Sequence, residues 1–410
     1  MTSGNQVELT LAKITSVVEN DQCSGCGACA ALFPTLGMEL DRSGFLRPDL
    51  SRIGELGDLD DSNLLEKFEN ICPGLQVEMP PVVNNVHPVF GTYVSSWVAW
   101  ATDGEVRSKG SSGGVITALN DWMLSTGKVT SVSAVQSDSS APTRAVPVVI
   151  SRKEDVLGSA GSRYQPVASC TGDANVGAFT GKPCEVYAQK KLDQSTGIER
   201  ASYMSFFCAG TPSQRATDKL IGELGGTVES TRELKYRGDG WPGNFVIKDE
   251  GGTERSRSYH DSWGAVLGRD LQYRCKVCVD GTGEHADIAV GDFWHADERG
   301  YPLFEDAEGR SVVLARTQRG DDLLRRAVEA GVIEGEPLTS LDELNGVQPL
   351  QVARRNTLWG RLLGRRLAGY RVPQYPDYSL SKLALKSPIA NARAAAGSFL
   401  RSRKERLGGK

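Results

Sequence analysis

Apolar and polar positions along the chain predict an alternation of short strands and helices. The stretch from Val94 to Thr102 is typical of a strand, and an apolar pattern with a helical period runs from Val115 to Ser125. The same patterns predict further strands at 131–136, 145–150, 202–207, 233–236, 244–247, 288–290 and 311–316, and further helices at 62–68, 214–224 and 321–330. Such an order favours an α/β fold with a largely mixed or parallel sheet covered by helices, becoming α+β in its second half.

Three parts are expected along the chain. Residues 1–80 form a small cysteine-bearing unit, residues 81–350 form the α/β body, and residues 351–410 form a helical tail with helices at 357–367 and 389–407. The tail holds fourteen Lys and Arg residues against two acidic ones, so it is strongly basic. A solvated terminal segment is the ordinary interpretation of such a tail. Docking to an acidic partner protein, to the body or to a second copy is the functional alternative.

Composition and charge exclude several classes of protein. The 410 residues carry a formal net charge of −4, and no run of eighteen apolar residues suggests a membrane span. The first residues lack a basic segment followed by an apolar one, so a cytoplasmic protein is expected. No nucleic-acid-reading motif is recognisable. The nine cysteines form an odd number, and in a reducing compartment clustered cysteines are more often metal ligands than disulfides.

The first cysteines have the spacing of an iron–sulfur site. Cys23, Cys26 and Cys29 follow the C-x-x-C-x-x-C pattern of bacterial ferredoxins, in which three thiolates reach three corners of one cubane. Cys72, which precedes Pro73, is the expected fourth ligand although 42 residues separate it from Cys29. A structural zinc site on the same residues is the alternative, but zinc ribbons generally use two separated pairs.

The remaining cysteines give a weaker signal. Cys275 and Cys278 form a lone C-x-x-C pair, which suits a redox dithiol, half a zinc site or half a cluster site. Cys184 lies on a turn at a predicted helix start, and Cys208 ends a predicted strand, so both are placed to converge at one sheet edge. Burial as small core residues is the alternative for these two. Cys170 has no cysteine neighbour in the sequence and is interpreted as an ordinary free thiol.

A glycine-rich loop precedes the helix predicted at 115–125. Its sequence Gly110-Ser111-Ser112-Gly113-Gly114 allows close backbone approach, and the helix N-terminus offers free amides to an anion. Most such loops are plain turns, so the pattern alone does not establish a binding site. It is not a dinucleotide-binding fingerprint, because no G-x-G-x-x-G opens a helix here.

Taken together, these motifs resemble those of the coenzyme F420 hydrogenase/dehydrogenase beta-subunit family, which includes plant 7-hydroxymethyl chlorophyll a reductase. The resemblance runs from about Cys23 to about Gly331. It rests on the cysteine triplet and on the ordered segments Lys109–Gly114, Gly161–Tyr164, Gly181–Cys184, Phe207–Ser213, Tyr236–Trp241, Cys275–Cys278 and Asp287–Trp294.

The resemblance implies two 4Fe–4S clusters and FAD. By position, it makes Cys184, Cys208, Cys275 and Cys278 the ligands of a second cluster. It implies that the FAD is held by Lys109, Gly110, Ser111, Ser112, Gly113, Gly114, Thr117, Arg163 and Tyr164. The family's usual Gly-Thr-Pro-Cys-Gln is Gly-Lys-Pro-Cys-Glu here, so Lys182 and Glu185 are expected to bring charges beside the second cluster and to act in catalysis.

The expected function is that of an iron–sulfur flavoprotein oxidoreductase. A flavin couples hydride chemistry to one-electron transfer, which explains its occurrence with clusters. We expect a reductase that takes electrons from ferredoxin or reduced coenzyme F420 and passes them to an organic substrate, which the cationic and aromatic residues suggest to be anionic and planar. The alternative is an F420-linked electron-input subunit of a larger complex. His295 is the candidate proton donor, against a structural role.

Overall fold

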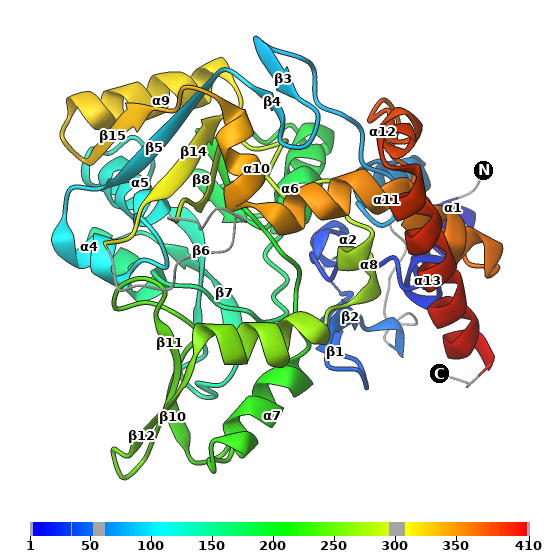
Figure 1. Ribbon diagram of the computed structural model, residues 1–410, viewed down its shortest axis with the longest axis horizontal. Helices are drawn as coiled ribbons and strands as arrows, with labels where there is room; N and C mark the ends of the chain where they lie inside the picture. The colour runs from blue at the N-terminus through cyan, green and yellow to red at the C-terminus, as the bar shows by residue number, and fades with distance from the viewer. Residues whose placement is uncertain (1–2, 34, 52–61, 295–307, 408–410) are drawn as a thin grey trace.

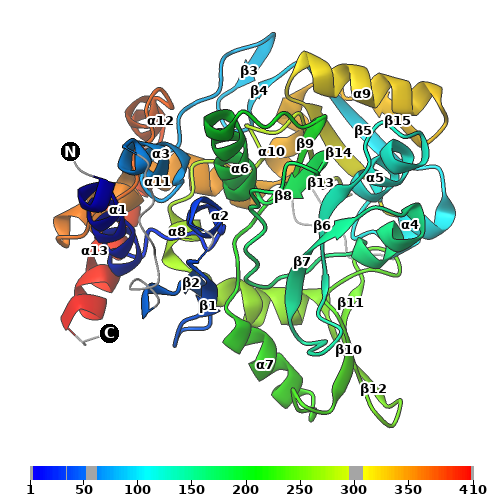
Figure 2. The same cartoon turned by 180° about the vertical axis from the view of Figure 1, so that it is seen from behind.

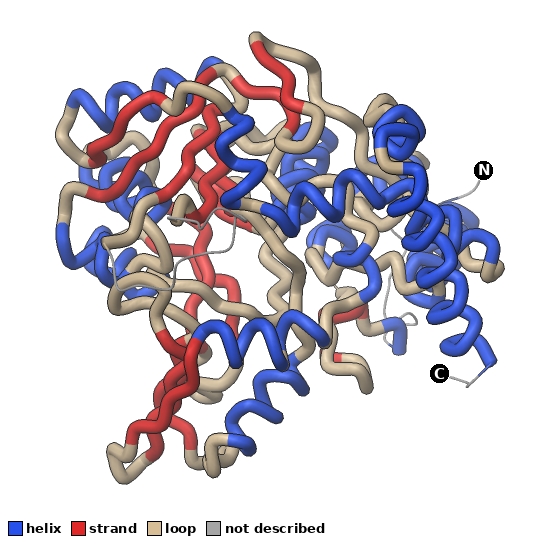
Figure 3. Tube along the Cα trace, in the orientation of Figure 1, coloured by secondary structure: helices blue, strands red, loops and turns tan. Residues whose placement is uncertain are grey.

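The computed structural model describes residues 3–33, 35–51, 62–294 and 308–407. Figure 1 shows an α/β body on one side and a cluster of helices on the other, with both ends of the chain on the helical side. Within the described residues, no helix combines the length and apolar character that crossing a bilayer requires. Figure 3 shows how the strands gather in the body while helices dominate the opposite end.

An eight-stranded mixed sheet forms the centre of the body. Its strand order is β15-β5-β14-β13-β9-β8-β6-β7. The four inner strands β13, β9, β8 and β6 run parallel, and the strands outside them pair antiparallel. The bounds are β5 Ser95–Ala101, β6 Val132–Ser137, β7 Ala145–Ile150, β8 Ala178–Gly181, β9 Ser202–Phe206, β13 Ile288–Asp292, β14 Ser311–Ala315 and β15 Ile333–Pro337.

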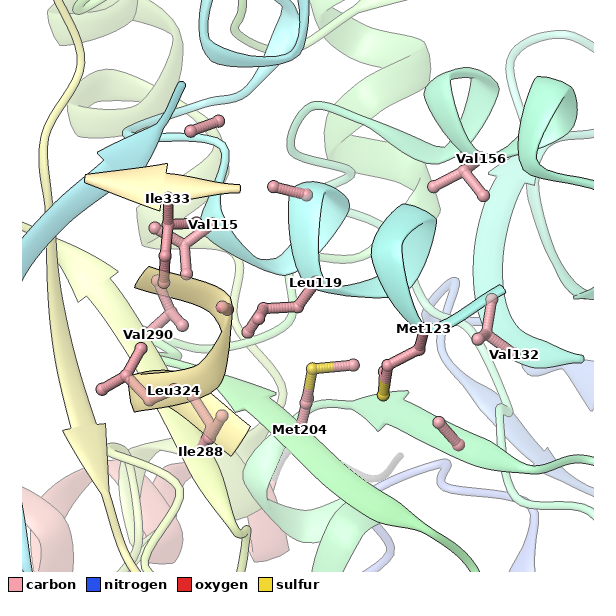
Figure 4. Packing of buried hydrophobic residues seen from close by; sticks show 14 of the residues in the cluster. Val115, Leu119, Met123, Val132, Val156, Met204, Ile288, Val290, Leu324 and Ile333 are labelled. Atoms are coloured by element: carbon pink, nitrogen blue, oxygen red, sulfur yellow. The ribbon is translucent and has the colours of Figure 1, made fainter. Parts of the chain in front are cut away.

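Helices cover both faces of this sheet, so the body has three layers. Along β13, Ile288 and Val290 face one apolar layer and Ala289 faces the other, as the two-residue period of a strand requires. The first layer receives α5 (Val115–Ser125) and α9 (Gln318–Glu329), as Figure 4 shows. The second receives α6 (Pro183–Thr196) and α10 (Leu344–Val347). A sheet buried on both faces explains the nearly continuous apolar strands.

A smaller antiparallel sheet extends from the body. It consists of β10 (Thr231–Lys235), β11 (Asn244–Asp249) and β12 (Glu254–Ser258), and α7 (Gln214–Glu223) packs with it around Leu220 and Phe245. The other body elements are β3 Asn85–His87, β4 Gly91–Tyr93, α4 Gly104–Lys109 and α8 Tyr273–Lys276, together with short 3-10 and π turns at Lys153–Ser159, His260–Gly264, Leu267–Arg269 and Leu341–Glu343.

The N-terminal residues build a unit around their own apolar core. Its elements are α1 Ser3–Glu19, α2 Ala28–Leu32, β1 Met38–Leu40, β2 Leu46–Pro48 and α3 Leu64–Ile71. Ile14, Phe33 and Phe68 are buried in this core. The helix α2 contacts α6 of the body, so the unit is packed against the sheet domain.

The C-terminal helices pack closely on one another and on the rest of the chain. They are α11 Pro349–Leu367, α12 Leu380–Lys386 and α13 Pro388–Leu407. Gly360 and Gly364 allow this approach, because an added Cβ would lie 2.2 Å from the Asn391 oxygen and 2.1 Å from the Ala395 oxygen. Arg365 is fully buried and pairs with Asp21 of the N-terminal unit at 2.6 Å.

These features test the expectations from the sequence. The mixed α/β architecture and the helical C-terminal region are confirmed, and the predicted helix from Val115 to Ser125 has those bounds in the structure. The expectation of a solvated tail is wrong for three of its arginines. Arg354, Arg355 and Arg365 are buried, because their guanidinium groups bind carbonyls and carboxylates of the body and the N-terminal unit.

Candidate functional site

The four cysteines predicted for the first cluster line one pocket. Cys23 and Cys26 lie on the loop that leads into α2, Cys29 lies in the first turn of that helix, and Cys72 caps the end of α3. The loop turns tightly because Gly25 and Gly27 adopt left-handed backbone conformations, with φ values of 71° and 85°. Apart from Ser24, the remaining lining is glycine, proline and apolar side chains.

Backbone amides point at these sulfur atoms. The Gly25 N–H donates to the Cys23 Sγ at 3.4 Å. Burial, followed by the charges of Cys26 and Cys23, raises the pKa of the Cys72 thiol to about 12. Burial raises the pKa of Cys29 as well. Thiols in this position become thiolates only when a cation compensates their charge, as a bound metal does.

The four body cysteines are brought together from three separate segments. Cys184 lies in the first turn of α6, Cys208 follows β9, and Cys275 and Cys278 lie in and just after α8. Burial, followed by the charge of Cys275, raises the pKa of the Cys208 thiol to about 12. The Thr211 N–H donates to the Cys275 Sγ at 3.3 Å. We call these eight residues, the N-terminal and the body set, the cysteine core.

The two sets of the cysteine core lie against one another. Figures 1 and 2 both place α8 beside α2. The Gln272 side chain donates to the Ser24 carbonyl oxygen at 2.9 Å and to the Cys275 Sγ at 3.4 Å, so one amide links the N-terminal cysteine loop to the body set. The Cys184 thiol also interacts electrostatically with Cys26.

Cys170 is a free thiol, as the sequence indicated, but folding places it beside Cys26 and Cys184. Its backbone N–H donates to the Cys26 carbonyl oxygen at 3.0 Å, and its thiol donates to the Glu185 carbonyl oxygen at 3.5 Å. A hydrogen bond from the Cys170 side chain lowers the pKa of Cys26 to about 7, against the effect of burial. No sequence pattern indicated this contact, because the two residues are 144 positions apart.

Lys182 and Glu185 form a buried ion pair at the start of α6. The Lys182 Nζ lies 2.6 Å from the Glu185 Oε1 and donates to the Val167 oxygen at 3.0 Å. Glu185 also accepts the Lys182 N–H, which closes a capping box. Both charges therefore lie beside Cys184, and each largely neutralises the other. This arrangement differs from an isolated cation next to the body set.

The glycine-rich loop joins two helices at the end of the sheet. Gly110 ends α4, and Gly114, with a φ of 73°, precedes α5. The Gly113 N–H donates to the Ser311 Oγ at 2.9 Å, and its oxygen accepts the Ala101 N–H at 2.7 Å. The Ser112 Oγ donates to the Arg310 oxygen at 2.5 Å. The loop is thus fixed to β5 and β14 by its own hydrogen bonds.

Arg237 contacts this loop, and the sequence did not single it out. Its guanidinium is buried, pairs with Asp292 at 2.8 Å and donates to the Ser111 oxygen. It also donates to the Tyr164 hydroxyl at 3.3 Å and lies 4.7 Å from the centre of the Trp241 ring. Arg237 lies within the Tyr236–Trp241 segment, and the family resemblance of that segment was the only sequence signal that pointed to this arginine.

The other predicted flavin residues have different surroundings. Lys109 pairs with Glu105 at 2.8 Å on the surface of α4, and Thr117 is half-buried in α5. Arg163 donates to carbonyls of its own segment, at 2.9 Å to Gly158 and 3.1 Å to Ser159. His295 lies outside the described residues.

No group of three or more His, Cys, Asp or Glu side chains converges closely enough to hold a metal ion within the described part of the chain. The N-terminal cysteines surround a shared pocket instead of a single point. In a 4Fe–4S cubane each cysteine binds a different iron atom, so the cysteines are spread around the cluster. The arrangement and the chemistry of the donors fit such a group.

Comparison with protein families identifies the class of this fold. The family model for the N-terminal region of the coenzyme F420 hydrogenase/dehydrogenase beta subunit matches residues 96–171, and the model for its C terminus matches residues 175–340. The chain therefore belongs to the coenzyme F420 hydrogenase/dehydrogenase beta-subunit family. Both matches begin after Cys72, so the N-terminal set lies outside the matched residues.

Several relatives extend the comparison. The coenzyme F420 hydrogenase subunit beta of Methanococcus voltae is 28% identical over 69% of this chain and 99% of its own length. The F420-dependent formate dehydrogenase 1 subunit beta of Methanococcus maripaludis is 27% identical over 57% of this chain and 59% of its own length. The coenzyme F420-dependent sulfite reductase of Methanocaldococcus jannaschii is 23% identical over 83% of this chain and 51% of its own length.

A solved structure shares the fold. A chain of the F420-reducing [NiFe] hydrogenase complex from Methanosarcina barkeri superimposes with a TM-score of 0.52 at 21% identity, covering 71% of this chain and 99% of that chain. At this identity the likeness concerns the fold alone.

Proposed function

We propose that this protein is an iron–sulfur flavoprotein oxidoreductase that exchanges electrons with coenzyme F420. The observation that carries the proposal is the cysteine core, in which two sets of four cysteines meet inside a member of an F420-linked family. Membership in a family of oxidoreductase subunits supports the redox role. The names of the relatives favour coenzyme F420 over ferredoxin as the redox partner.

The cysteine core would hold two 4Fe–4S clusters. The N-terminal set would supply four thiolates to one cluster and the body set four to the other. The amides of Gly25 and Thr211 already point at ligand sulfurs, and such hydrogen bonds stabilise the anionic form. The apolar lining beyond the N-terminal loop excludes water from the N-terminal site.

FAD would bind at the glycine-rich loop. Ser111 of the loop contacts the Arg237 guanidinium, and the start of α5 offers amides to a phosphate. When bound, a flavin supplies the conversion between two-electron hydride transfer and one-electron transfer. The contacts of Arg163 and Lys109 with their own segments favour Arg237 as the main cation of this site.

The role of Lys182 and Glu185 is better described as positioning. Both are buried and bound to one another, and they fix the first turn of α6 where Cys184 lies. Neither contacts the glycine-rich loop through a hydrogen bond in the described structure.

A stand-alone reductase and a subunit of a larger complex differ in what accepts the electrons. The relatives named as subunits favour assembly with a partner protein. The sulfite reductase relative, of which this chain spans half, favours a reductase that acts on a small anion. More of these relatives support assembly with a partner protein than a stand-alone reductase.

The test begins with anaerobic purification and the measurement of iron, sulfide and flavin per chain. About eight irons and one FAD are expected. Reduced coenzyme F420 and reduced ferredoxin are then added separately while the flavin absorbance is followed. Bleaching by reduced F420 alone supports the proposal. Bleaching by ferredoxin alone assigns a ferredoxin-linked reductase, and a protein with zinc and no flavin contradicts both.

A further inference from the structure

A buried arginine lies beside the body cysteines without a carboxylate partner. Arg274 is 1% exposed and belongs to α8, directly before Cys275. Within the described residues it forms no ion pair with an acidic side chain. Its Nε and Nη2 atoms donate to the Pro73 oxygen at 3.2 and 2.7 Å. The cation therefore requires another source of negative charge.

The other buried arginines of this chain provide a comparison. Most of them pair with carboxylates: Arg200 with Asp193, Arg237 with Asp292, Arg355 with Glu284, and Arg365 with Asp21 and Glu405. Arg316 contacts only carbonyls, but Glu284 and Asp280 act on it electrostatically. Arg354 is another buried arginine without a carboxylate partner in the described residues, and its donors contact the Cys208 carbonyl and the Gln351 side chain. The groups whose charges act most strongly on Arg274 are Tyr375 and the body cysteines Cys278, Cys184 and Cys275.

One donor of Arg274 is also unsatisfied. Its Nη1 atom is buried and makes no hydrogen bond, whereas the other two guanidinium nitrogens do. A buried N–H of a charged group that lacks an acceptor destabilises the fold, so such groups normally have one. A cubane with four thiolate ligands is an anion, and its sulfur atoms accept hydrogen bonds.

From these observations we propose that Arg274 is the counter-charge of the body cluster. Its free Nη1–H donates to that cluster, and its positive charge raises the reduction potential by stabilising the added electron. Its other donors hold the Pro73 carbonyl, next to Cys72, so the same side chain fixes the spacing of the two sets. This inference rests on the function proposed above.

The neighbouring Lys276 provides a matched control. It lies on the same helix and carries the same charge, but it is exposed to solvent. The variants R274Q, R274K and K276Q are purified anaerobically, and both clusters are followed by electron paramagnetic resonance during a redox titration. The C275S variant identifies which signal belongs to the body cluster.

We expect R274Q to make reduction of the body cluster at least tenfold less favourable, which lowers its midpoint potential by about 59 mV or more. K276Q is expected to shift it by much less, because water screens an exposed charge. R274K keeps the positive charge, so we expect the midpoint potential of its body cluster to stay close to the wild-type value. If R274Q contains both clusters at unchanged potentials, or shifts no more than K276Q, the inference is overturned.

Loss of the body cluster during purification is also informative. If R274Q lacks about four irons while R274K retains them, the positive charge is what holds the cluster. If both variants lose the iron equally, Arg274 acts by packing, and the inference is wrong. A wild-type protein without iron contradicts the proposed function itself, which the iron count shows before any titration begins.

Discussion

The cysteine core and the glycine-rich loop offer their expected cofactors opposite kinds of site. Burial, followed by the charges of neighbouring thiolates, raises the pKa of Cys72 to about 12, so the deprotonated form of this region gains from a bound cation. The loop has already satisfied its own groups, with Ser112 and Gly113 bonded to β14 and to the residue before it. The spacing of the cysteines is therefore informative in the sequence alone, whereas the glycine-rich loop gives a weak signal until the fold shows its contacts.

The largest expected effect concerns the body set. The variant C275S removes one of four ligands, so we expect about four of about eight irons to be lost while the N-terminal cluster remains. Iron analysis and the paramagnetic signal of the reduced protein measure this. Full iron retention would show that the body set does not hold a cluster.

Cys170 supplies the control for that experiment. It contacts Cys26 but is not counted among the eight ligands. The C170S variant is expected to retain all the iron, because serine replaces the small thiol at nearly the same size. Equal iron loss in C170S and C275S would make Cys170 a ninth member of the core.

A second prediction tests the glycine-rich loop. A Cβ on Gly113 would lie 2.6 Å from the Ala99 oxygen, so G113V must displace the loop. We expect flavin affinity to fall by on the order of a hundredfold, about 2.7 kcal/mol, with the iron content unchanged. The control is G104A, at a position where an added Cβ meets nothing within 4 Å. Unchanged flavin content in G113V would mean that the loop is only a turn.

A third prediction compares two arginines of the same region. R237Q removes the cation that contacts Ser111, so we expect flavin binding to weaken by about tenfold, near 1.4 kcal/mol. R163Q removes a guanidinium that faces its own segment and is expected to change binding by less than about threefold. Flavin titration of the stripped protein measures both. The reverse order would return Arg163 to the role that the sequence first suggested.

The smallest effect is expected where the body meets the N-terminal unit. Burial lowers the pKa of His285 to about 4, and its Nε2–H donates to the backbone carbonyl oxygen of Glu78 at 2.9 Å. The unfolded chain takes up this proton near pH 6.5 but the folded chain does not, so stability falls as the pH drops below about 6.5. The wild-type protein should lose about 1 kcal/mol of unfolding free energy through this histidine between about pH 7 and pH 5.5, and H285Q should not show that loss. Denaturant unfolding at both values measures it, and an unchanged pH slope contradicts the assignment.

Local features could be predicted from the sequence. The apolar periodicity of Val115 to Ser125 predicted a helix with the observed bounds, because burial of one face dictates that pattern. The triplet from Cys23 to Cys29 was recognisable because its cysteines lie within seven residues. The strand order was not predictable, since β5 pairs with β14 and β15 from more than 200 residues away.

Contacts between distant segments account for what the sequence did not reveal. Arg237 looks like any charged residue until folding brings it to Ser111. Arg354 and Arg365 were counted as surface charges of a basic tail, and only the fold supplies their carbonyl and carboxylate partners. Charge counts describe how much charge a segment carries but not where its side chains end.

The position of α11 also bears on the order in which the molecule is made. Arg354 of this helix binds the Cys208 carbonyl at 2.9 Å, Arg361 binds that of Lys276 at 3.0 Å, and Arg365 reaches Asp21. All eight cysteines of the core precede Pro349, where α11 begins. A ribosome therefore completes the eight cysteines before it makes the helix that packs against them. On the function proposed above, iron can enter before α11 is in place.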